Sequence, residues 1–204
     1  DHYKKSFDLK ENINFVGDIT PIYCSLNSNQ LSYIKEGLES RGFKIKVFFI
    51  LRDPYERCLS MLKKDVSRGN TRILKMFTKA NGSDYVNLNN FTINEQVIRT
   101  NYEKIIPNIK KSFNSDDIYI DFFERLHTHE FSQRLFNFLG VPLNNIDINE
   151  ITNKAQEINN EKEEVESLRL EVVNYYSDTY KYVINEYGSI VSDLWSKSIN
   201  YLNI

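Results

Sequence analysis

Cationic side chains and a hydroxyl gather where a helical pattern follows the most apolar stretch of the sequence. The apolar run at 47–51 leads directly into Arg52, Asp53 and Pro54. Pro54 suits the first turn of a helix, because its missing N–H would have no intrahelical partner there. Free N–H groups, the helix dipole and a planar guanidinium all attract an anion, so the start of this helix favours phosphate. The stretch therefore predicts half of a phosphate-binding site.

Three further side chains share one face of the same helix. Arg57, Ser60 and Lys64 follow one another at spacings of three and four residues, which places them on neighbouring turns. A hydroxyl between two cations can bind the same phosphate as Arg52. The alternative is structural: Arg52 would pair with Asp53 or with a carboxylate across the sheet, and Ser60 would only be solvated.

The elements that must position these residues alternate between short apolar runs and amphipathic helical patterns, which favours an α/β fold. We expect strands at 13–16, 44–51 and 117–123. The second of these lacks polar alternation, as a central, buried, parallel strand would. Because ligands bind beyond the carboxyl ends of parallel strands, Arg52 lies where a site is expected.

Helical patterns cover five stretches of the chain: 29–41, 54–66, 92–109, 128–139 and 161–187. Ser28 is the expected N-cap of the first, Thr128 caps the fourth, and Gly140 and Gly188 end the last two. Pro107 is expected to kink or divide the third. Apolar and tyrosine side chains along one side of the last pattern predict a packed face, and the tail with Trp195 is expected to dock on the body.

Length and composition bound the kind of protein. With 204 residues, 41% of them hydrophobic, the chain 1–204 fits a single domain. A formal charge of -2 gives no overall basic field, so no nucleic-acid partner is expected. The longest apolar run is far shorter than the roughly 20 residues of a membrane span, so none is expected. Polar, Gly and Asn residues at 69–90 predict a variable insertion or loop that shapes a ligand-binding pocket.

The sequence offers little for a metal ion. Cys24 and Cys58 lie far apart and form no C-x-x-C pair. His127 and His129 have no third ligand nearby in sequence, so we interpret them as solvated loop residues and expect no metal. The low thiol count and the absence of a visible leader favour an intracellular location.

Five segments, in order along nearly the whole chain, resemble motifs of the sulfotransferase family, enzymes that use 3'-phosphoadenosine 5'-phosphosulfate (PAPS). The R-D-P-x-x-R-x-x-S stretch at 52–60 resembles the family's 3'-phosphate-binding motif. The segment G-D-I-T-P-I-Y at 17–23 resembles the family's G-E-K-T-P-x-Y element, and 118–126 resembles a strand that ends in Y-E-x-L. The segment 136–140 resembles the family's F-L-G turn. The Tyr-rich last helix, followed by Gly188 and Trp195, resembles its closing region.

The resemblance implies a three-layer P-loop-like parallel sheet flanked by helices and transfer of a sulfuryl group from PAPS to a hydroxyl or amine, without a metal. In that family Arg52 and Ser60 would hold the 3'-phosphate of PAPS or of the product PAP, with Arg57 and Lys64 beside them. Phe123 would lie beside the adenine, or else would be a buried strand residue.

The same resemblance implies that the segment 17–23 binds the acceptor, the molecule that receives the sulfuryl group. Asp18 would act as general base, although an Asp at a strand end is as often a turn residue. Thr20, Pro21 and Tyr23 would contact the acceptor. Ile19 replaces the family's lysine, which disfavours a heparan-like acceptor, and carbohydrate, lipid, small alcohol and peptide tyrosine stay open.

One family motif has no match here, a lysine- and glycine-containing loop after the first strand that grips the 5'-phosphosulfate. The seven glycines form no cluster. We therefore expect a chain that is truncated at the N-terminus, lacks the first strand and loop, and is inactive as given. A non-catalytic nucleotide- or phosphate-binding domain is the main alternative. A weaker one is a P-loop kinase in which Asp53 would serve a Mg²⁺ ion.

Overall fold

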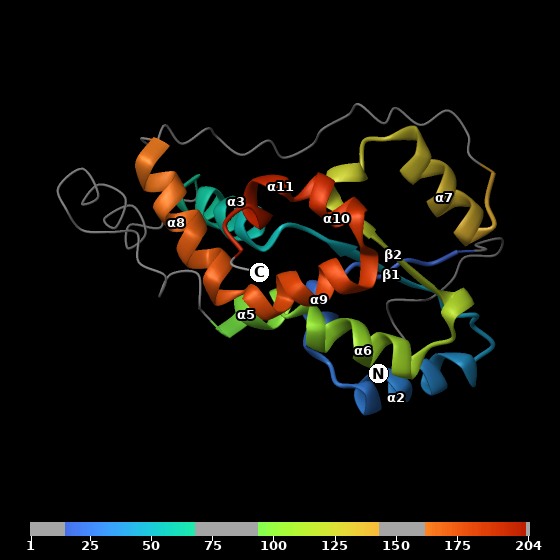
Figure 1. The fold of residues 1–204 in the computed structure, drawn as a ribbon. Coiled ribbons are helices and arrows are strands. Elements are labelled where there is room, and N and C mark those ends of the chain that lie inside the picture. Colours follow the sequence, from blue (N-terminus) through green and yellow to red (C-terminus); the bar gives the residue numbers. More distant parts are fainter. Residues whose placement is uncertain (1–14, 68–93, 143–161, 203–204) are drawn as a thin grey trace.

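A small parallel sheet surrounded by helices forms the centre of the protein (Figure 1). The computed structural model describes residues 15–67, 94–142 and 162–202. In these residues the sheet consists of β1 (Val47–Leu51) and β2 (Ile118–Phe122), which pair in parallel with Leu51 opposite Phe122. The expected α/β class is confirmed, in a form that is mostly helical.

Nine α-helices and three 3₁₀ segments accompany the strands in the described residues. The α-helices are α2 (Ser28–Glu39), α3 (Pro54–Ser67), α5 (Asn94–Thr100), α6 (Tyr102–Ser112), α7 (His129–Leu139), α8 (Lys162–Tyr175), α9 (Ser177–Tyr187), α10 (Ser189–Leu194) and α11 (Ser196–Ile199). The 3₁₀ segments are η1 (Pro21–Ser25), η3 (Ser115–Asp117) and η4 (Phe123–Arg125).

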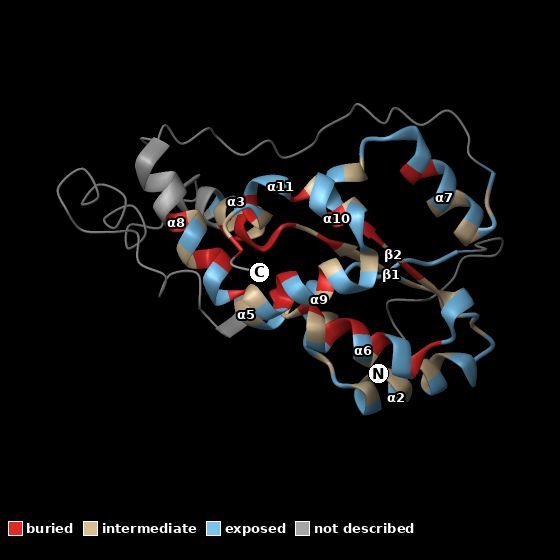
Figure 2. Cartoon of the chain, viewed as in Figure 1, coloured by how far each residue is buried: buried red, intermediate tan, exposed pale blue. Residues whose placement is uncertain are grey.

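The two faces of the sheet are covered by different helices. Phe48 and Phe49 point to opposite faces, because side chains alternate along a strand. Phe48 stacks on Tyr119 at 5.6 Å and meets Phe131 of α7, whereas Phe49 meets Tyr102 of α6 edge-on at 6.0 Å. Buried residues are most continuous where the strands meet α6 and α9 (Figure 2), so the main core lies on that second face.

Several helix ends form as the sequence predicts. Pro54 begins α3, and the Thr128 hydroxyl caps α7 by accepting the N–H of Phe131 at 3.2 Å. Gly140 ends α7 in the left-handed conformation with φ of 71°, which favours glycine. The first helix differs by one residue: its N-cap is Asn27 rather than Ser28, because Asn27 and Gln30 form a reciprocal capping box.

Two predicted helices are divided, one at a residue other than the predicted one and one where no break was predicted. Pro107 is inside α6 and does not divide it; its ring is exposed, and the neighbouring isoleucines are buried in the core. The break falls at Asn101, one residue before Tyr102, whose side chain is completely buried. The expected helix over 161–187 is two helices that meet at Tyr176, and the bend keeps the predicted apolar face, including Val172 and Tyr180, buried on both sides.

The strand predictions are partly wrong. The expected strand at 13–16 is not formed by its described residues, Phe15 and Val16, which are exposed coil. Strand β1 has one partner strand and lies at a sheet edge among the described residues. Only Leu51 of its five residues is fully buried, so the prediction of a deeply buried strand is wrong. The predicted insertion at 69–90 and the Thr92 capping box lie outside the described residues.

The tail packs on the body as expected. Trp195 is 1% exposed and contacts the rings of Tyr102, Phe122 and Tyr180. This indole therefore joins the last helices to the sheet and to α6. In Figure 1 the short helix α11 lies beside the start of α3, where Ser198 meets Asp53.

Candidate functional site

Arg52 and Phe123 meet at the carboxyl ends of the two parallel strands. Arg52 follows Leu51 and Phe123 follows Phe122, and these strand ends are register partners. The guanidinium carbon of Arg52 lies 4.3 Å from the centroid of the Phe123 ring, a cation–π contact. Phe123 is 39% exposed and belongs to η4, so the alternative that it is a buried strand residue is wrong.

The Arg52 side chain is half-buried and carries its charge without an ion pair to any described residue. Burial lowers the pKa of Arg52, while Glu56 and Glu124 are near enough for their charges to oppose that shift. A half-buried guanidinium of this kind gains more from an anionic ligand than a fully solvated one does.

Asp53 does not pair with Arg52, which was the structural alternative. Its side chain is 3% exposed and turns into the protein. The carboxylate accepts the N–H of Tyr55 at 2.9 Å and the hydroxyls of Tyr180 and Ser198 at 2.5 and 2.6 Å. The first of these bonds makes Asp53 the N-cap of α3. Both oxygens are thus occupied by protein donors, which disfavours the interpretation of Asp53 as a magnesium ligand.

Burial raises the pKa of Asp53, and the hydroxyls of Ser198 and Tyr180 oppose the shift. A buried carboxylate is stable only when its oxygens are hydrogen-bonded, so these hydroxyls have an energetic role. Ser198 also accepts from Arg169 at 3.0 Å, and the Arg169 guanidinium lies 4.0 Å from the centroid of the Tyr55 ring. The C-terminal helices therefore brace the start of α3.

The other three residues of the predicted phosphate site lie on α3. Arg57 and Ser60 are half-buried and Lys64 is exposed. The Nε atom of Arg57 is buried without a hydrogen-bond partner in the described part of the chain. Its positive charge acts to lower the pKa of Arg52 and that of the Cys24 thiol, so Arg57 lies near both residues.

The predicted acceptor residues form a small exposed cluster before and within η1. The carboxylate of Asp18 accepts the hydroxyls of Thr20, at 2.6 Å, and of Tyr23, and Pro21 begins η1. Both hydrogen bonds lower the pKa of Asp18, and the bond from Thr20 has the larger effect. A carboxylate whose pKa is lowered is a weaker proton acceptor, so the arrangement does not favour Asp18 as a general base.

Two residues that sequence analysis missed hold the backbone at the strand end. The buried hydroxyl of Tyr102 accepts the N–H of Arg52 at 3.2 Å and donates to its C=O at 2.8 Å. Glu124 accepts the N–H of Asp53 at 3.2 Å. Glu124 stands at the acid of the Y-E-x-L match and could have been noticed there, but Tyr102 is 50 residues from Arg52 and carries no local signal.

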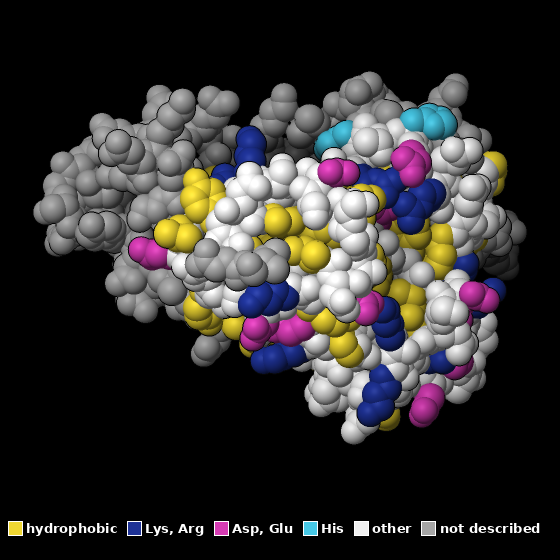
Figure 3. All heavy atoms as spheres, in the orientation of Figure 1, with side chains coloured by type: hydrophobic (Ala, Val, Ile, Leu, Met, Phe, Trp, Pro, Cys, Tyr) yellow, Lys and Arg dark blue, Asp and Glu magenta, His cyan; other side chains and the backbone are white. Residues whose placement is uncertain are grey.

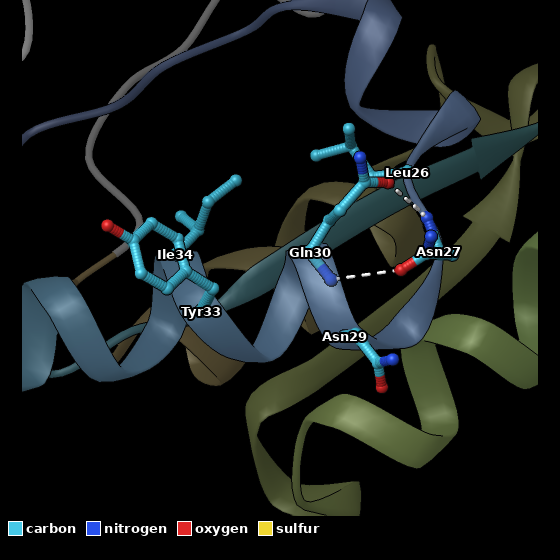
Figure 4. A pocket seen from close by; sticks show the side chains of 6 residues that line it. All are labelled: Leu26, Asn27, Asn29, Gln30, Tyr33 and Ile34. Atoms are coloured by element: carbon cyan, nitrogen blue, oxygen red, sulfur yellow. Dashed lines mark hydrogen bonds between the residues drawn. The ribbon is translucent and has the colours of Figure 1, made fainter.

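Two surface grooves formed by described residues lie elsewhere. One of about 430 Å³ runs along the start of α2 and is drawn in Figure 4; its lining residues are Leu26, Asn27, Asn29, Gln30, Tyr33 and Ile34. Another, of about 400 Å³, lies where α6 approaches β2. Neither includes a predicted site residue. Acidic and basic side chains are mixed over the face shown in Figure 3, in keeping with the small net charge.

Within the described ranges, no three His, Cys, Asp or Glu side chains are placed to hold a metal ion, and His127 and His129 belong to no such group. No helix in these ranges is long and apolar enough to cross a membrane. The fold and the strand-end site together define an α/β protein with a candidate anion-binding site. No protein-family model, curated protein or solved structure matches the chain.

Proposed function

We propose that this protein is a PAPS-dependent sulfotransferase whose nucleotide site lies at the carboxyl ends of β1 and β2. The observation that carries the proposal is the contact of Arg52 with Phe123 at 4.3 Å. A permanent cation beside a partly exposed aromatic ring suits a phosphorylated adenine nucleotide, because one group attracts phosphate and the other offers a stacking surface. Both residues fall within segments that resemble the family's motifs.

The residues of the site fit such a nucleotide in two respects. Arg52 is half-buried and makes no ion pair with a described residue, so its charge is open to an anion. Arg57, one turn further along α3, has a buried Nε without a hydrogen-bond partner in the described part. A phosphate oxygen would satisfy such a donor. Ser60 is half-buried on the next turn and Lys64 is exposed beyond it.

The same proposal extends to the fold. The parallel pair β1 and β2, with a helix starting directly after β1, is the arrangement from which a three-layer P-loop-like sheet is built. We infer that the two strands belong to such a sheet.

Bound PAPS would supply the activated sulfuryl group. Arg52 and Ser60 would bind and neutralise its 3'-phosphate, and the first turn of α3 would add its N–H groups. Phe123 would orient the adenine. Thr20 and Tyr23, already joined through Asp18, would present hydroxyl groups to an acceptor alcohol or amine.

A calorimetric titration with 3'-phosphoadenosine 5'-phosphate (PAP) and with 5'-AMP tests the nucleotide site. We expect PAP to bind at least tenfold more tightly, because a charge-assisted pair is worth roughly 1.5–3 kcal/mol. The substitution Arg52→Ala should remove this difference, whereas Arg41→Ala, at an exposed arginine after α2, should not. Equal affinity of the unchanged protein for the two nucleotides would refute the proposal.

A second candidate function is nucleotide binding without transfer. The lowered pKa of Asp18, caused by its bonds from Thr20 and Tyr23, favours it, because this carboxylate is then a poor proton acceptor. Transfer of label from radioactive PAPS to a panel of phenols, sugars and lipids distinguishes the two. PAP binding together with no transfer to any acceptor would support the second.

A further inference from the structure

The backbone of Arg52 is held at both of its polar groups by one side chain. The hydroxyl of Tyr102 accepts the Arg52 N–H at 3.2 Å and donates to the Arg52 C=O at 2.8 Å. This residue lies just beyond the end of β1, where strand pairing can no longer fix the backbone. The Tyr102 clamp, as we call these two bonds, takes over that role.

The Tyr102 clamp is rigid on its own side. The tyrosine is 0% exposed at the start of α6, and its ring contacts Phe49 and Trp195. A hydroxyl at the tip of so tightly packed a ring has little freedom to move. The Arg52 backbone is therefore fixed relative to the hydrophobic core.

We propose that Tyr102 is a positioning residue of the nucleotide site: its hydroxyl fixes the Arg52 backbone and so places the guanidinium against Phe123, where it meets the 3'-phosphate. This inference rests on the proposed function. A guanidinium on a backbone free to rotate would spread over many positions, and ordering it on binding would cost affinity. The clamp removes that cost before the nucleotide arrives.

Tyr102→Phe deletes the clamp and keeps the ring. The readout is the ratio of the 5'-AMP and PAP dissociation constants, because general damage to the site would weaken both nucleotides alike. We expect this ratio to fall by roughly two- to tenfold, the range expected for one or two hydrogen bonds. In an Arg52→Ala background the same substitution should leave the ratio unchanged, since the clamp acts only through Arg52.

The control is Tyr119→Phe. Tyr119 is also buried, and its hydroxyl donates to the buried Asp121 at 2.9 Å, but it lies on the α7 face of the sheet. The Tyr119→Phe substitution should lower stability and leave the ratio of the 5'-AMP and PAP dissociation constants unchanged. A folded Tyr102→Phe variant with the unchanged ratio would overturn this inference alone. If the unchanged protein does not prefer PAP to 5'-AMP, the proposed function is overturned and the inference with it.

If Tyr102→Phe does not fold, amide hydrogen exchange in the unchanged protein decides. The clamp and the 3'-phosphate act on the same residue, so PAP should slow exchange of the Arg52 N–H at least twofold more than saturating 5'-AMP does. Equal protection by the two nucleotides would overturn the inference.

Discussion

Removal of one buried hydroxyl, in Tyr180→Phe, tests whether the C-terminal helices support the start of α3. Tyr180 is 0% exposed and donates to Asp53 Oδ1 at 2.5 Å. Phenylalanine keeps the ring and its contact with Trp195 and leaves almost no cavity. The change removes the bond to Asp53 and a longer one, at 3.3 Å, that the hydroxyl accepts from the N–H of Tyr55. After it, Asp53 keeps only the bonds from Ser198 and from the N–H of Tyr55.

The size of the effect follows from the burial of the carboxylate. A hydrogen bond to a charged group contributes roughly 1.5–3 kcal/mol, because the buried partner cannot turn to water instead. For a chain of this length each kcal/mol shifts the melting temperature by roughly 2–4 °C. We therefore expect Tyr180→Phe to lower it by roughly 3–12 °C at neutral pH.

The stability that Tyr180→Phe loses should depend on pH and should be smaller in acid. The Tyr180 hydroxyl is one of the groups that oppose the burial-driven rise in the pKa of Asp53, so its removal raises that pKa further. The folded variant then holds a proton more tightly than the folded wild type. Its deficit in the free energy of unfolding should shrink as the pH falls toward 4.

Urea unfolding at several pH values measures this deficit, with Tyr182→Phe as the matched control. Tyr182 is half-buried on the same helix and has no hydrogen-bond partner among the described residues, so its substitution should change the free energy by less than about 0.5 kcal/mol. The reasoning fails if Tyr180→Phe is as stable as this control at neutral pH, or if its deficit does not change with pH.

Three further predictions concern the site and its supports. Phe123→Leu removes the ring beside Arg52 and should weaken PAP binding by roughly five- to tenfold without changing the melting temperature by more than a few degrees, as calorimetry and thermal denaturation would show; unchanged affinity would contradict the stacking role. Because burial raises the pKa of Asp53, the folded protein binds that proton above the ordinary value of 3.8, so the stability of wild type relative to Asp53→Asn should increase as the pH falls from 7 to 4; a constant difference in urea titrations would argue against it. Gly140→Ala should cost about 1 kcal/mol through its φ of 71° alone, since nothing lies within 4 Å of the added Cβ, and a variant as stable as the parent would show that the turn relaxes.

Local sequence signals predicted the elements around the site. The apolar run before Arg52 gave a parallel strand, Pro54 began a helix, and Thr128 and Gly140 bounded α7, because each signal acts over only a few residues. The contact of Arg52 with Phe123 was not predicted: the family resemblance assigned the two residues to different parts of one nucleotide and said nothing of their distance. Whether these residues bind a nucleotide stays a prediction.

Long-range partners could not be predicted. Tyr180 and Ser198 meet Asp53 across 127 and 145 residues, and neither stands in a local pattern that distinguishes it from other tyrosines and serines of the C-terminal helices. The same holds for the exposure of β1. Its apolar run is typical of a buried central strand, yet Phe48 is 44% exposed, because how many strands flank a segment depends on the rest of the fold.

The distance in sequence between Asp53 and Ser198 has a consequence for biosynthesis. At roughly 5–20 residues per second, a ribosome needs roughly 7–30 s to make the intervening chain. During that time Asp53 remains a solvated carboxylate at the end of an unsupported helix, and its burial becomes favourable only when the last helices emerge. The strand end with Arg52 is therefore translated well before the helices that complete its final geometry.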